Sequence, residues 1–308
     1  MSTETAETLT DKYERRMGLS SAPVHHGEIL QGVFRHEGEL RRGLVTLPCA
    51  IYSVQAHFIP DDYAGVTVLP PWKVKAQRAA ELALAELGKT GGGLKLSGDV
   101  PLGRGFGSST SDVLAAVGAV QNAFSVSLPD DDVARIAVLA ETASDSLMYP
   151  STTVLFAHRD GEVIEDFGYP MPPLRVLGFG SRPGATGTGV DTLALPPAAY
   201  DAEEIERFAE LRRMLGEAMA AKDVTLLGEV ATASTRINQR RLPVPRLESI
   251  LAIADEAGAV GVQTAHSGDI AGLMFDPGRL DVSERMAQAG RLLRDIEITE
   301  QWEFETGG

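Results

Sequence analysis

The sequence is poor in cysteine, in basic residues and in long apolar runs, and each shortage excludes a class of protein. Cys49 is the sole cysteine among 308 residues, so an intrachain disulfide or a cysteine-based zinc site cannot form. Lys and Arg number 28 against 43 Asp and Glu, which gives a formal net charge of −15. Proteins that coat nucleic acid or lie on anionic membranes need a basic surplus instead, so we expect neither partner.

No apolar run approaches the length of a membrane span. The longest, such as Val113–Val120, fall far short of the roughly 20 residues that cross a bilayer. The first 16 residues are polar and mixed in charge, unlike a secretion signal. We therefore expect a cytoplasmic protein. Its composition, 44% hydrophobic and 23% charged, is that of an ordinary globular chain.

The order of strand and helix patterns predicts an α+β fold in two lobes. Residues 1–20 lack apolar periodicity and are expected to form a flexible arm. An N-terminal lobe is predicted over 21–170 and a C-terminal lobe over 171–308, because the proline-rich stretch Tyr169–Pro173 lies between two apolar runs.

Several elements can be placed from local patterns alone. The run Leu44–Phe58 alternates like a strand, and Pro48 within it indicates an edge or a bulge. Pro129 begins a predicted helix that reaches about Ser144. The residues Arg159–Gly161 separate two β-rich runs and predict a hairpin.

Glycine is the residue in excess, with 32 of 308 positions, and one group of glycines carries a chemical signal. Gly103, Gly105 and Gly107 alternate in a loop between a predicted strand and a predicted helix. Alternate glycines let the backbone approach a ligand, and a helix start offers unpaired N–H groups at the positive end of its dipole. This combination suits a phosphate. The alternative is a glycine-rich turn that only caps the helix.

The segment Pro101–Thr110 resembles the P-x-G-x-G-L-G-S-S-A signature of the galactokinase, homoserine kinase, mevalonate kinase and phosphomevalonate kinase (GHMP) superfamily. Two further blocks occur in the family's order. Ala22-Pro23 resembles the start of the first motif, and Gly261–Gly268 resembles the third, a second glycine loop near the phosphates. The resemblance implies a two-lobed GHMP kinase fold, with a ribosomal-protein-S5-domain-2-like N-terminal lobe and a ferredoxin-like C-terminal lobe. It also implies a kinase that uses ATP and Mg²⁺.

The first motif departs from the sequence pattern of most members, in which A-P-G-K is followed several residues later by G-E-H. His25 stands in the usual lysine place, and Gly27-Glu28 comes earlier. This pattern is similar to that of the L-threonine kinase branch associated with cobamide side-chain synthesis, as are the segments Leu44–Pro48 and Val190–Thr192. The resemblance therefore implies an amino-acid-like acceptor, L-threonine or a related hydroxy amino acid.

The resemblance also assigns roles around the phosphates. Asp145 resembles the catalytic aspartate, acting as a base or orienting the substrate, and its alternative is an ordinary loop aspartate. Glu141 lies four residues earlier, one helical turn, and resembles the Mg²⁺-binding glutamate, with Ser109 as a second metal ligand. A solvated glutamate is the alternative. The residues assigned to the ATP phosphates are Gly103, Arg104, Gly105, Phe106, Gly107, Ser108, Ser109 and Thr110.

The acceptor is expected to contact the first motif and loops of the second lobe. Glu28 is a polar residue inside an apolar run, and a buried acid needs a partner such as an amino group, although a structural Arg or Lys would also serve. His25 could bind or orient the acceptor, but its type and position favour an exposed or satisfied structural histidine, and His266 is given no role. The residues assigned to the acceptor are His25, Glu28, Gln31, Asp191, Thr192, Ser267 and Gly268.

Two other functions stay open at this point. One is a nucleotide- or ligand-binding regulatory module without catalysis, and the other is a kinase-type decarboxylase that phosphorylates its substrate before elimination. In every case the partner is a small molecule rather than nucleic acid or a membrane. Whether the chain forms a homodimer is also open.

Overall fold

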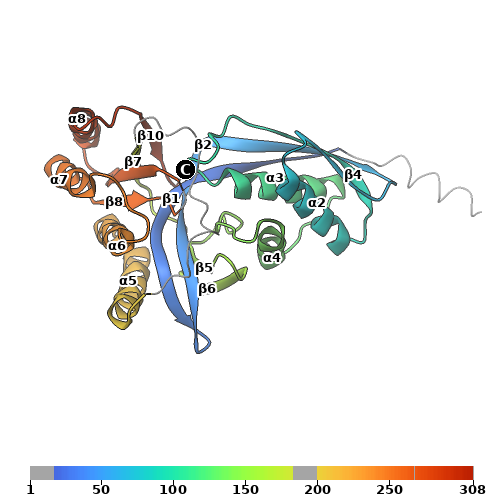
Figure 1. Cartoon of the computed structure of the whole chain (residues 1–308), viewed down its shortest axis with the longest axis horizontal. Helices are drawn as coiled ribbons and strands as arrows, with labels where there is room; N and C mark the ends of the chain where they lie inside the picture. Colours follow the sequence, from blue (N-terminus) through green and yellow to red (C-terminus); the bar gives the residue numbers. More distant parts are fainter. Residues whose placement is uncertain (1–16, 183–199, 267, 308) are drawn as a thin grey trace, which may run out of the picture.

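In a computed structural model, the residues that can be described are 17–182, 200–266 and 268–307. They form a mixed α/β fold around one curved sheet (Figure 1). Its main path runs β10-β7-β9-β8-β1-β2-β4-β3, with β5 joined to β2 and β6 joined to β5. The strands are β1 (Gly18–His36), β2 (Glu39–Asp61), β3 (Gly65–Leu69), β4 (Gly91–Ser97), β5 (Val154–Ala157), β6 (Glu162–Asp166), β7 (Arg175–Gly180), β8 (Gly261–Thr264), β9 (Ile270–Phe275) and β10 (Gln301–Glu305).

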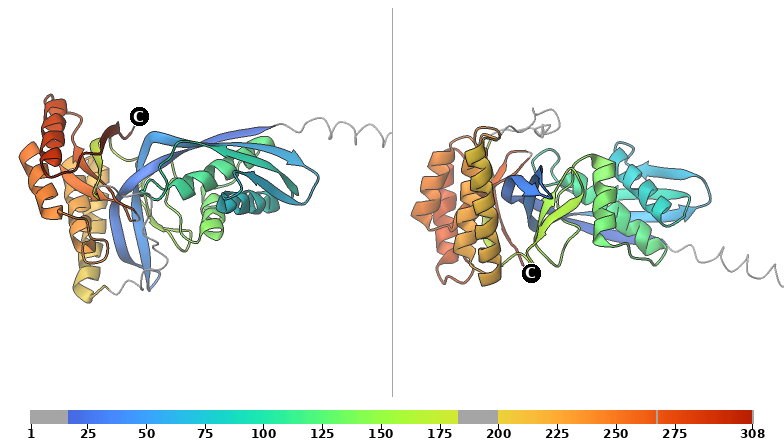
Figure 2. Two further views of the ribbon diagram at one scale, coloured as in Figure 1. Left: turned by 45° about the horizontal axis from the view of Figure 1, so that its top comes forward. Right: turned by 90° about the horizontal axis from the view of Figure 1, so that it is seen from below.

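Helices gather at the two ends of the molecule, and each group covers its own hydrophobic core (Figure 2). Three helices lie at one end, where two of them pack on β1–β4 and the third packs on those two helices, whereas four helices lie at the opposite end. The helices are α2 (Val74–Glu86), α3 (Ser108–Ala123), α4 (Asp130–Glu141), α5 (Ala202–Ala221), α6 (Val224–Asn238), α7 (Leu247–Ala257) and α8 (Val282–Asp295).

The long hairpin of β1 and β2 links the two ends. Its strands have 19 and 23 residues and pair from Gly18 with Phe58 to His36 with Glu39. β1 therefore begins at Gly18, so the last residues of the expected arm belong to the sheet, whereas 1–16 lie outside the described residues. A Cβ on Gly18 would lie 1.9 Å from the Ala119 carbonyl oxygen, which shows how tightly α3 covers this strand.

Two bulges in β1 bring polar side chains to one face of the hairpin. His25 pairs with Pro48, Glu28 with Thr46 and Gln31 with Leu44, with register shifts on both sides of Glu28. The three β2 partners are two residues apart and share a face, so the three polar residues of β1 share it too. A regular strand would have sent residues three apart to opposite faces. β2 is irregular next to Pro48, as predicted, because Pro23 pairs with Ser53 and Val24 with Cys49, but β2 is an inner strand rather than an edge.

Several local predictions can be compared directly. β4, the glycine loop and α3 follow one another as expected, and β5 and β6 form the expected hairpin. The helix predicted to reach about Ser144 instead ends at Glu141, with Thr142 in the left-handed region. Asp145 therefore lies beyond α4, and the one-turn spacing assumed between it and Glu141 is wrong. The stretch Tyr169–Pro173 lies between β6 and β7.

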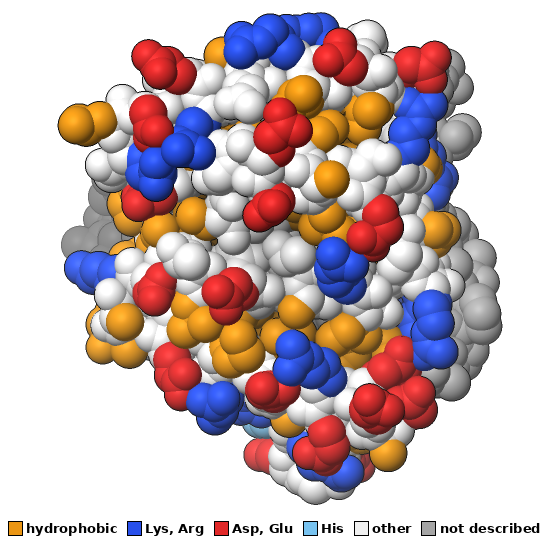
Figure 3. Space-filling model, turned by 90° about the vertical axis from the view of Figure 1, so that its left-hand side faces the viewer, with side chains coloured by type: hydrophobic (Ala, Val, Ile, Leu, Met, Phe, Trp, Pro, Cys, Tyr) orange, Lys and Arg blue, Asp and Glu red, His pale blue; other side chains and the backbone are white. Residues whose placement is uncertain are grey.

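The surface on the side of α5–α8 carries acidic and basic side chains interspersed with apolar ones, without a large area of one sign (Figure 3). Such mixing gives no broad electrostatic field at this face. Among the described residues, no helix combines the length and the apolar character that a membrane span requires.

Candidate active site

The glycine loop adopts a backbone that only glycine tolerates easily. Gly103, Gly105 and Gly107 have φ values of 69°, 102° and 66°, all in the left-handed region. Gly107 is the N-cap of α3, which has no side-chain cap and no acidic residue in its first turn. The first N–H groups of α3, at the positive end of the helix dipole, are therefore available to bind an anion. Ser108 and Ser109 lie in this first turn.

This loop meets β1 and the segment after α4 at one point. The backbone N–H of His25 donates to the Phe106 carbonyl at 3.1 Å, and the Ser111 hydroxyl donates to the Pro23 carbonyl at 2.7 Å. A Cβ on Gly107 would lie 2.1 Å from the His25 ring and 3.0 Å from the Asp145 carboxylate. The first and second motifs are therefore in direct contact.

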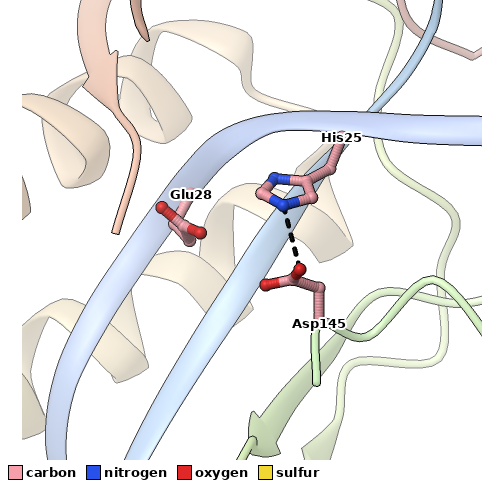
Figure 4. Close-up of side chains that lie close together, drawn as sticks. All are labelled: His25, Glu28 and Asp145. Atoms are coloured by element: carbon pink, nitrogen blue, oxygen red, sulfur yellow. Dashed lines mark ion pairs between the residues drawn. The ribbon is translucent and has the colours of Figure 1, made fainter. Parts of the chain in front are cut away.

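His25 and Asp145 form a buried ion pair, with 2.9 Å between Nε2 and Oδ2 (Figure 4). Burial lowers the pKa of His25, but the Asp145 carboxylate outweighs it and raises this pKa to about 9. Burial raises the pKa of Asp145, but His25 and Thr110 outweigh it and lower the pKa to about 2. The Gly27 N–H donates to His25 Nδ1 at 3.0 Å. In the neutral ring Nδ1 accepts this hydrogen bond while Nε2–H donates to Asp145. In the imidazolium, which the raised pKa favours at pH 7, both nitrogens carry protons, so the pair with Asp145 persists and the Gly27 N–H loses its acceptor.

Glu28 is the residue that the fold leaves unsatisfied. Its side chain is buried, 3% exposed, and neither carboxylate oxygen has a hydrogen-bond partner among the described residues. Burial raises its pKa to about 8. Ligand atoms of Glu28, His25 and Asp145 lie within 4.8 Å of one another (Figure 4). The predicted pairing with a structural Arg or Lys is absent from the described part of the chain, so a positive ligand group would satisfy this acid.

Thr110 joins the two predicted acids through its hydroxyl. The hydroxyl oxygen lies 2.8 Å from Glu141 Oε1 and 3.1 Å from Asp145 Oδ2. A hydroxyl has one proton to donate, so both contacts can be hydrogen bonds only if one carboxyl is protonated. Burial raises the pKa of Glu141 to about 7, against the hydroxyls of Ser109 and Thr110. Glu141 is therefore the acid that holds the proton more readily.

Ser109 and Glu141 offer a donor set that fits a magnesium ion. Both supply oxygen, which Mg²⁺ prefers. Ser109 lies in the first turn of α3, where an anion would bind, and Glu141, at the end of α4, contacts Thr110 of the same turn. Burial is the main cause of the raised pKa of Glu141, and Lys75, the positive group that lowers this pKa, contributes less than the neighbouring Asp145 and the two hydroxyls. A dication would replace the proton that Glu141 otherwise takes up.

The side chain of Phe106 points away from the ligand face of the loop. It is 3% exposed and packs against the rings of His26, Tyr52 and Trp302 at centroid distances of 5.3–5.7 Å. A direct contact between this side chain and phosphate is therefore excluded by its burial, and Phe106 can offer only its backbone. Thr110 is likewise buried and bound to the two acids, so its hydroxyl is not a free phosphate donor.

Gln31 contacts His266, which in turn packs against His158, and neither histidine had an assigned role. Its side-chain oxygen lies 2.7 Å from His266 Nδ1, and the His266 ring is 5.3 Å from that of His158. Burial lowers the pKa of His158 to about 3 and that of His266 to about 4, so both rings are neutral at pH 7. His266 belongs to the third motif and could have been found from it, but no sequence signal marks His158.

A cavity of about 140 Å³ lies beside the face of the β1–β2 hairpin that carries His25 and Glu28. Its lining includes Thr46, Pro48, Ser146, Leu147 and Met171. Gly268 lies against the backbone of the first glycine loop. Of the remaining assigned residues, Asp191, Thr192 and Ser267 lie outside the described part of the chain.

Comparison with known families matches both lobes. Residues 74–150 match the GHMP kinases N terminal domain, and residues 205–291 match the GHMP kinases C terminal domain. Together these two segments make up just over half of the chain.

Individual relatives agree with the family match. The L-threonine kinase of Salmonella typhimurium is 27% identical over 295 residues, covering 93% of this chain and 91% of the relative. The L-threonine kinase of Citrobacter freundii is 29% identical over 195 residues, covering 59% and 62%. The crystal structure of homoserine kinase from Cytophaga hutchinsonii has a similar fold, with a TM-score of 0.66 and 16% identity over 94% of each chain. The chain belongs to the GHMP kinase family.

Proposed function

We propose that the protein is an ATP-dependent kinase that transfers the γ-phosphate to the hydroxyl of L-threonine or a related small hydroxy amino acid. The observation that supports an amino-acid acceptor is Glu28, a buried carboxylate to which no described residue donates a side-chain hydrogen bond. It lies close to the His25–Asp145 pair and on the same face of the hairpin. The two L-threonine kinases among the relatives support the same acceptor.

The nucleotide phosphates would lie at the start of α3. The N–H groups of the loop and the first helical turn would bind them, helped by the helix dipole and by the hydroxyls of Ser108 and Ser109. Ser109 and Glu141 would hold Mg²⁺, which supplies positive charge that neutralises the phosphates during transfer. Phe106 and Thr110 would support the loop from behind, since their side chains are buried.

Asp145 would orient the acceptor hydroxyl rather than remove its proton. A carboxylate with a pKa of about 2 is a poor proton acceptor at neutral pH. Its contacts with His25 and Thr110 both use Oδ2, and the side chain is 19% exposed. Oδ1 can therefore accept a hydrogen bond from the substrate hydroxyl and point it at the phosphate. Catalysis would then rest mainly on positioning and electrostatic stabilisation.

The ammonium group of the acceptor would bind Glu28. The pairing would bring a positive charge to a carboxyl whose charged form is disfavoured by burial, so binding would release its proton at neutral pH. Gln31 lies on the same face, and the cavity beside Ser146 has room for an apolar substituent. We also assign Asp191, Thr192, Ser267 and Gly268 to the acceptor site, as the family resemblance implies.

A steady-state assay of ADP release tests this proposal. We expect turnover with L-threonine, and weaker turnover with serine or homoserine. β-Hydroxybutyrate, which keeps the hydroxyl and lacks the amino group, should be a poor substrate, and O-methylthreonine should give none. Mass analysis should find a phosphoester without loss of carbon dioxide. Absence of turnover with all three amino acids would refute the acceptor, and carbon dioxide loss would instead indicate a decarboxylase.

A further inference from the structure

Arg104 lies in the middle of the glycine loop, but its side chain turns to the C-terminal lobe. Its Nε donates to Asp269 Oδ1 at 2.6 Å, and its two terminal nitrogens donate to the carboxylate of Glu300 at 2.9 and 2.8 Å. The Arg104 side chain is 12% exposed and that of Asp269 6%, whereas that of Glu300 is 57% exposed. The guanidinium is thus held by one buried and one exposed carboxylate.

The backbone at Arg104 is held from the same side. Its carbonyl accepts hydrogen bonds from the N–H of Asp269 at 3.0 Å and of Ile270 at 3.3 Å. A Cβ on Gly268 would lie 2.2 Å from this carbonyl, so only glycine allows the second glycine loop to come so close. The two loops therefore touch, backbone to backbone, at the residue whose side chain bridges the lobes.

The charges of this cluster argue against a direct contact with phosphate. One guanidinium faces two carboxylates, and Arg104 lowers the pKa of Glu300, which keeps that acid ionised. The cluster as a whole is negative and would repel an anion. The fork of an arginine matches a carboxylate in two-point contact, which fixes its geometry as well as its charge.

We propose that Arg104 is a positioning residue, which holds the phosphate loop in shape by tying it to Asp269 and Glu300, and that it does not bind the nucleotide. This inference rests on the proposed function, because it assumes that the loop binds ATP. It replaces the expectation that the Arg104 side chain contacts phosphate. Residues of two kinds alternate in the loop. The glycines leave the backbone open to the ligand, while the side chains of Arg104 and Phe106 contact Glu300 and Trp302, respectively, at β10 and hold the loop in place.

Three variants separate positioning from phosphate binding through the Kd of a fluorescent ATP analogue with Mg²⁺. Arg104→Met should weaken binding about tenfold or more, because it removes the bridge and leaves Asp269 buried without its partner. Arg104→Lys should weaken binding almost as much, because it keeps the charge and loses the fork. Glu300→Gln should weaken binding about two- to fivefold, since it removes the charge of the exposed partner.

A phosphate-binding Arg104 would give the opposite pattern. Release from Glu300 would free the guanidinium for the nucleotide, so Glu300→Gln would tighten binding, and Arg104→Lys would keep most of the affinity. Either result would overturn the proposal. Glu300→Gln keeps the pair with Asp269 and is expected to fold, which a thermal unfolding midpoint checks.

Arg175→Met is the matched control. Arg175 pairs with Glu303 and Glu305 of β10, the strand that follows Glu300, and both glutamates are more than half exposed. Arg175 pairs with the end of β10 that lies farther from Glu300. The Arg175→Met variant should bind the ATP analogue with wild-type affinity. If it weakened binding as much as Arg104→Met does, the proposal would be overturned. A wild-type protein that binds ATP but phosphorylates no hydroxy amino acid would refute the acceptor alone. One that does not bind ATP would refute both.

Discussion

Single residues in the site depend on one another for their charge. Asp145 is held ionised by His25, with a pKa of about 2, while Glu28 a few ångströms away has a pKa raised to about 8. The same small volume therefore stabilises one carboxylate and destabilises the other. Burial raises the pKa of both acids. The difference follows from their side-chain partners, because Asp145 has His25 and Thr110, whereas no described side chain bonds to Glu28.

Replacing Asp145 tests its role in turnover. Asp145→Asn keeps the size of the side chain and removes the charge that orients the hydroxyl, so kcat should fall by about 10² or more. The Kd for nucleotide should change little, because the loop backbone supplies that affinity. Steady-state kinetics and a nucleotide titration give both values. Asp130→Asn, on the exposed start of α4, is the control, and near-normal turnover of Asp145→Asn would remove Asp145 from the site.

Glu28 should make the ligand-free protein less stable as the pH rises. Its folded pKa of about 8 lies above the ordinary 4.5, so between these values the folded state binds more protons than the unfolded state. The free energy of unfolding therefore decreases with pH across that window. Glu28→Gln removes this effect and should be more stable than wild type at pH 8, by about 1–3 kcal/mol, but not at pH 4.5.

Thermal or urea unfolding at the two pH values measures this difference. Glu39→Gln, an exposed residue on the same hairpin, is the control and should show the wild-type pH profile. The same Glu28→Gln variant should lose affinity for threonine while keeping that for nucleotide. Parallel pH profiles for wild type and Glu28→Gln would show that the buried acid is not the cause.

At the scale of elements, the glycine loop offers a test with a close internal control. Gly107 and Gly88 have similar φ values, 66° and 63°, but a Cβ at Gly107 would meet His25, whereas one at Gly88 would meet nothing within 4 Å. Gly88→Ala should cost about 1 kcal/mol of stability and leave ATP binding intact. Gly107→Ala should in addition weaken ATP binding about tenfold or more, because it displaces His25 and the start of α3.

A nucleotide titration and an unfolding curve for each variant separate the two effects. Wild-type affinity in both variants would mean that the contact with His25 does not limit nucleotide binding. Weakened binding in both would mean that the loss comes from global destabilisation.

What could be predicted from the sequence was local. The alternating glycines and the hydroxyl residues after them are neighbours in the chain, so the strand, loop and start of α3 were found correctly. The bulges around Glu28 could not be found, because they come from the register of β1 against β2 and from packing on Gln263 and Ala265. The family motif pointed to His25 and Glu28, but their shared face is a property of the sheet.

Contacts between distant residues were the main source of error. Arg104 meets Asp269 and Glu300, which are 165 and 196 residues away, and nothing in the loop's own sequence indicates that pairing. Glu141 and Asp145 were linked by an assumed helical turn, but α4 ends at Glu141, and Thr110 of α3 bridges them instead. Tertiary contacts thus decided roles that spacing alone could not.

At the scale of the whole molecule, the site is built from both lobes on a hairpin that runs through both. β1 carries His25 and Glu28. The glycine loop precedes α3 and Asp145 follows α4, whereas Gly268 precedes β9 and Glu300 precedes β10. α3 and α4 lie at one end of the molecule, and β10 lies toward the other (Figure 1). The proposed ligand is an anion, yet the chain has a net charge of −15. Local backbone N–H groups and Mg²⁺ must therefore attract the nucleotide against the field of the molecule.

This opposition predicts how salt should affect nucleotide binding. The long-range field of the chain repels an approaching nucleotide, and it is screened as the Debye length falls from about 30 Å at 0.01 M to about 10 Å at 0.1 M salt. The contacts at the start of α3 are short and partly buried, so salt screens them less. We therefore expect the association rate of Mg²⁺-ATP, measured by stopped flow, to rise a few-fold over this range while the dissociation rate changes little. An association rate that falls with salt would mean that a local basic surface, such as Lys73 and Lys75 beside α3, governs the encounter instead.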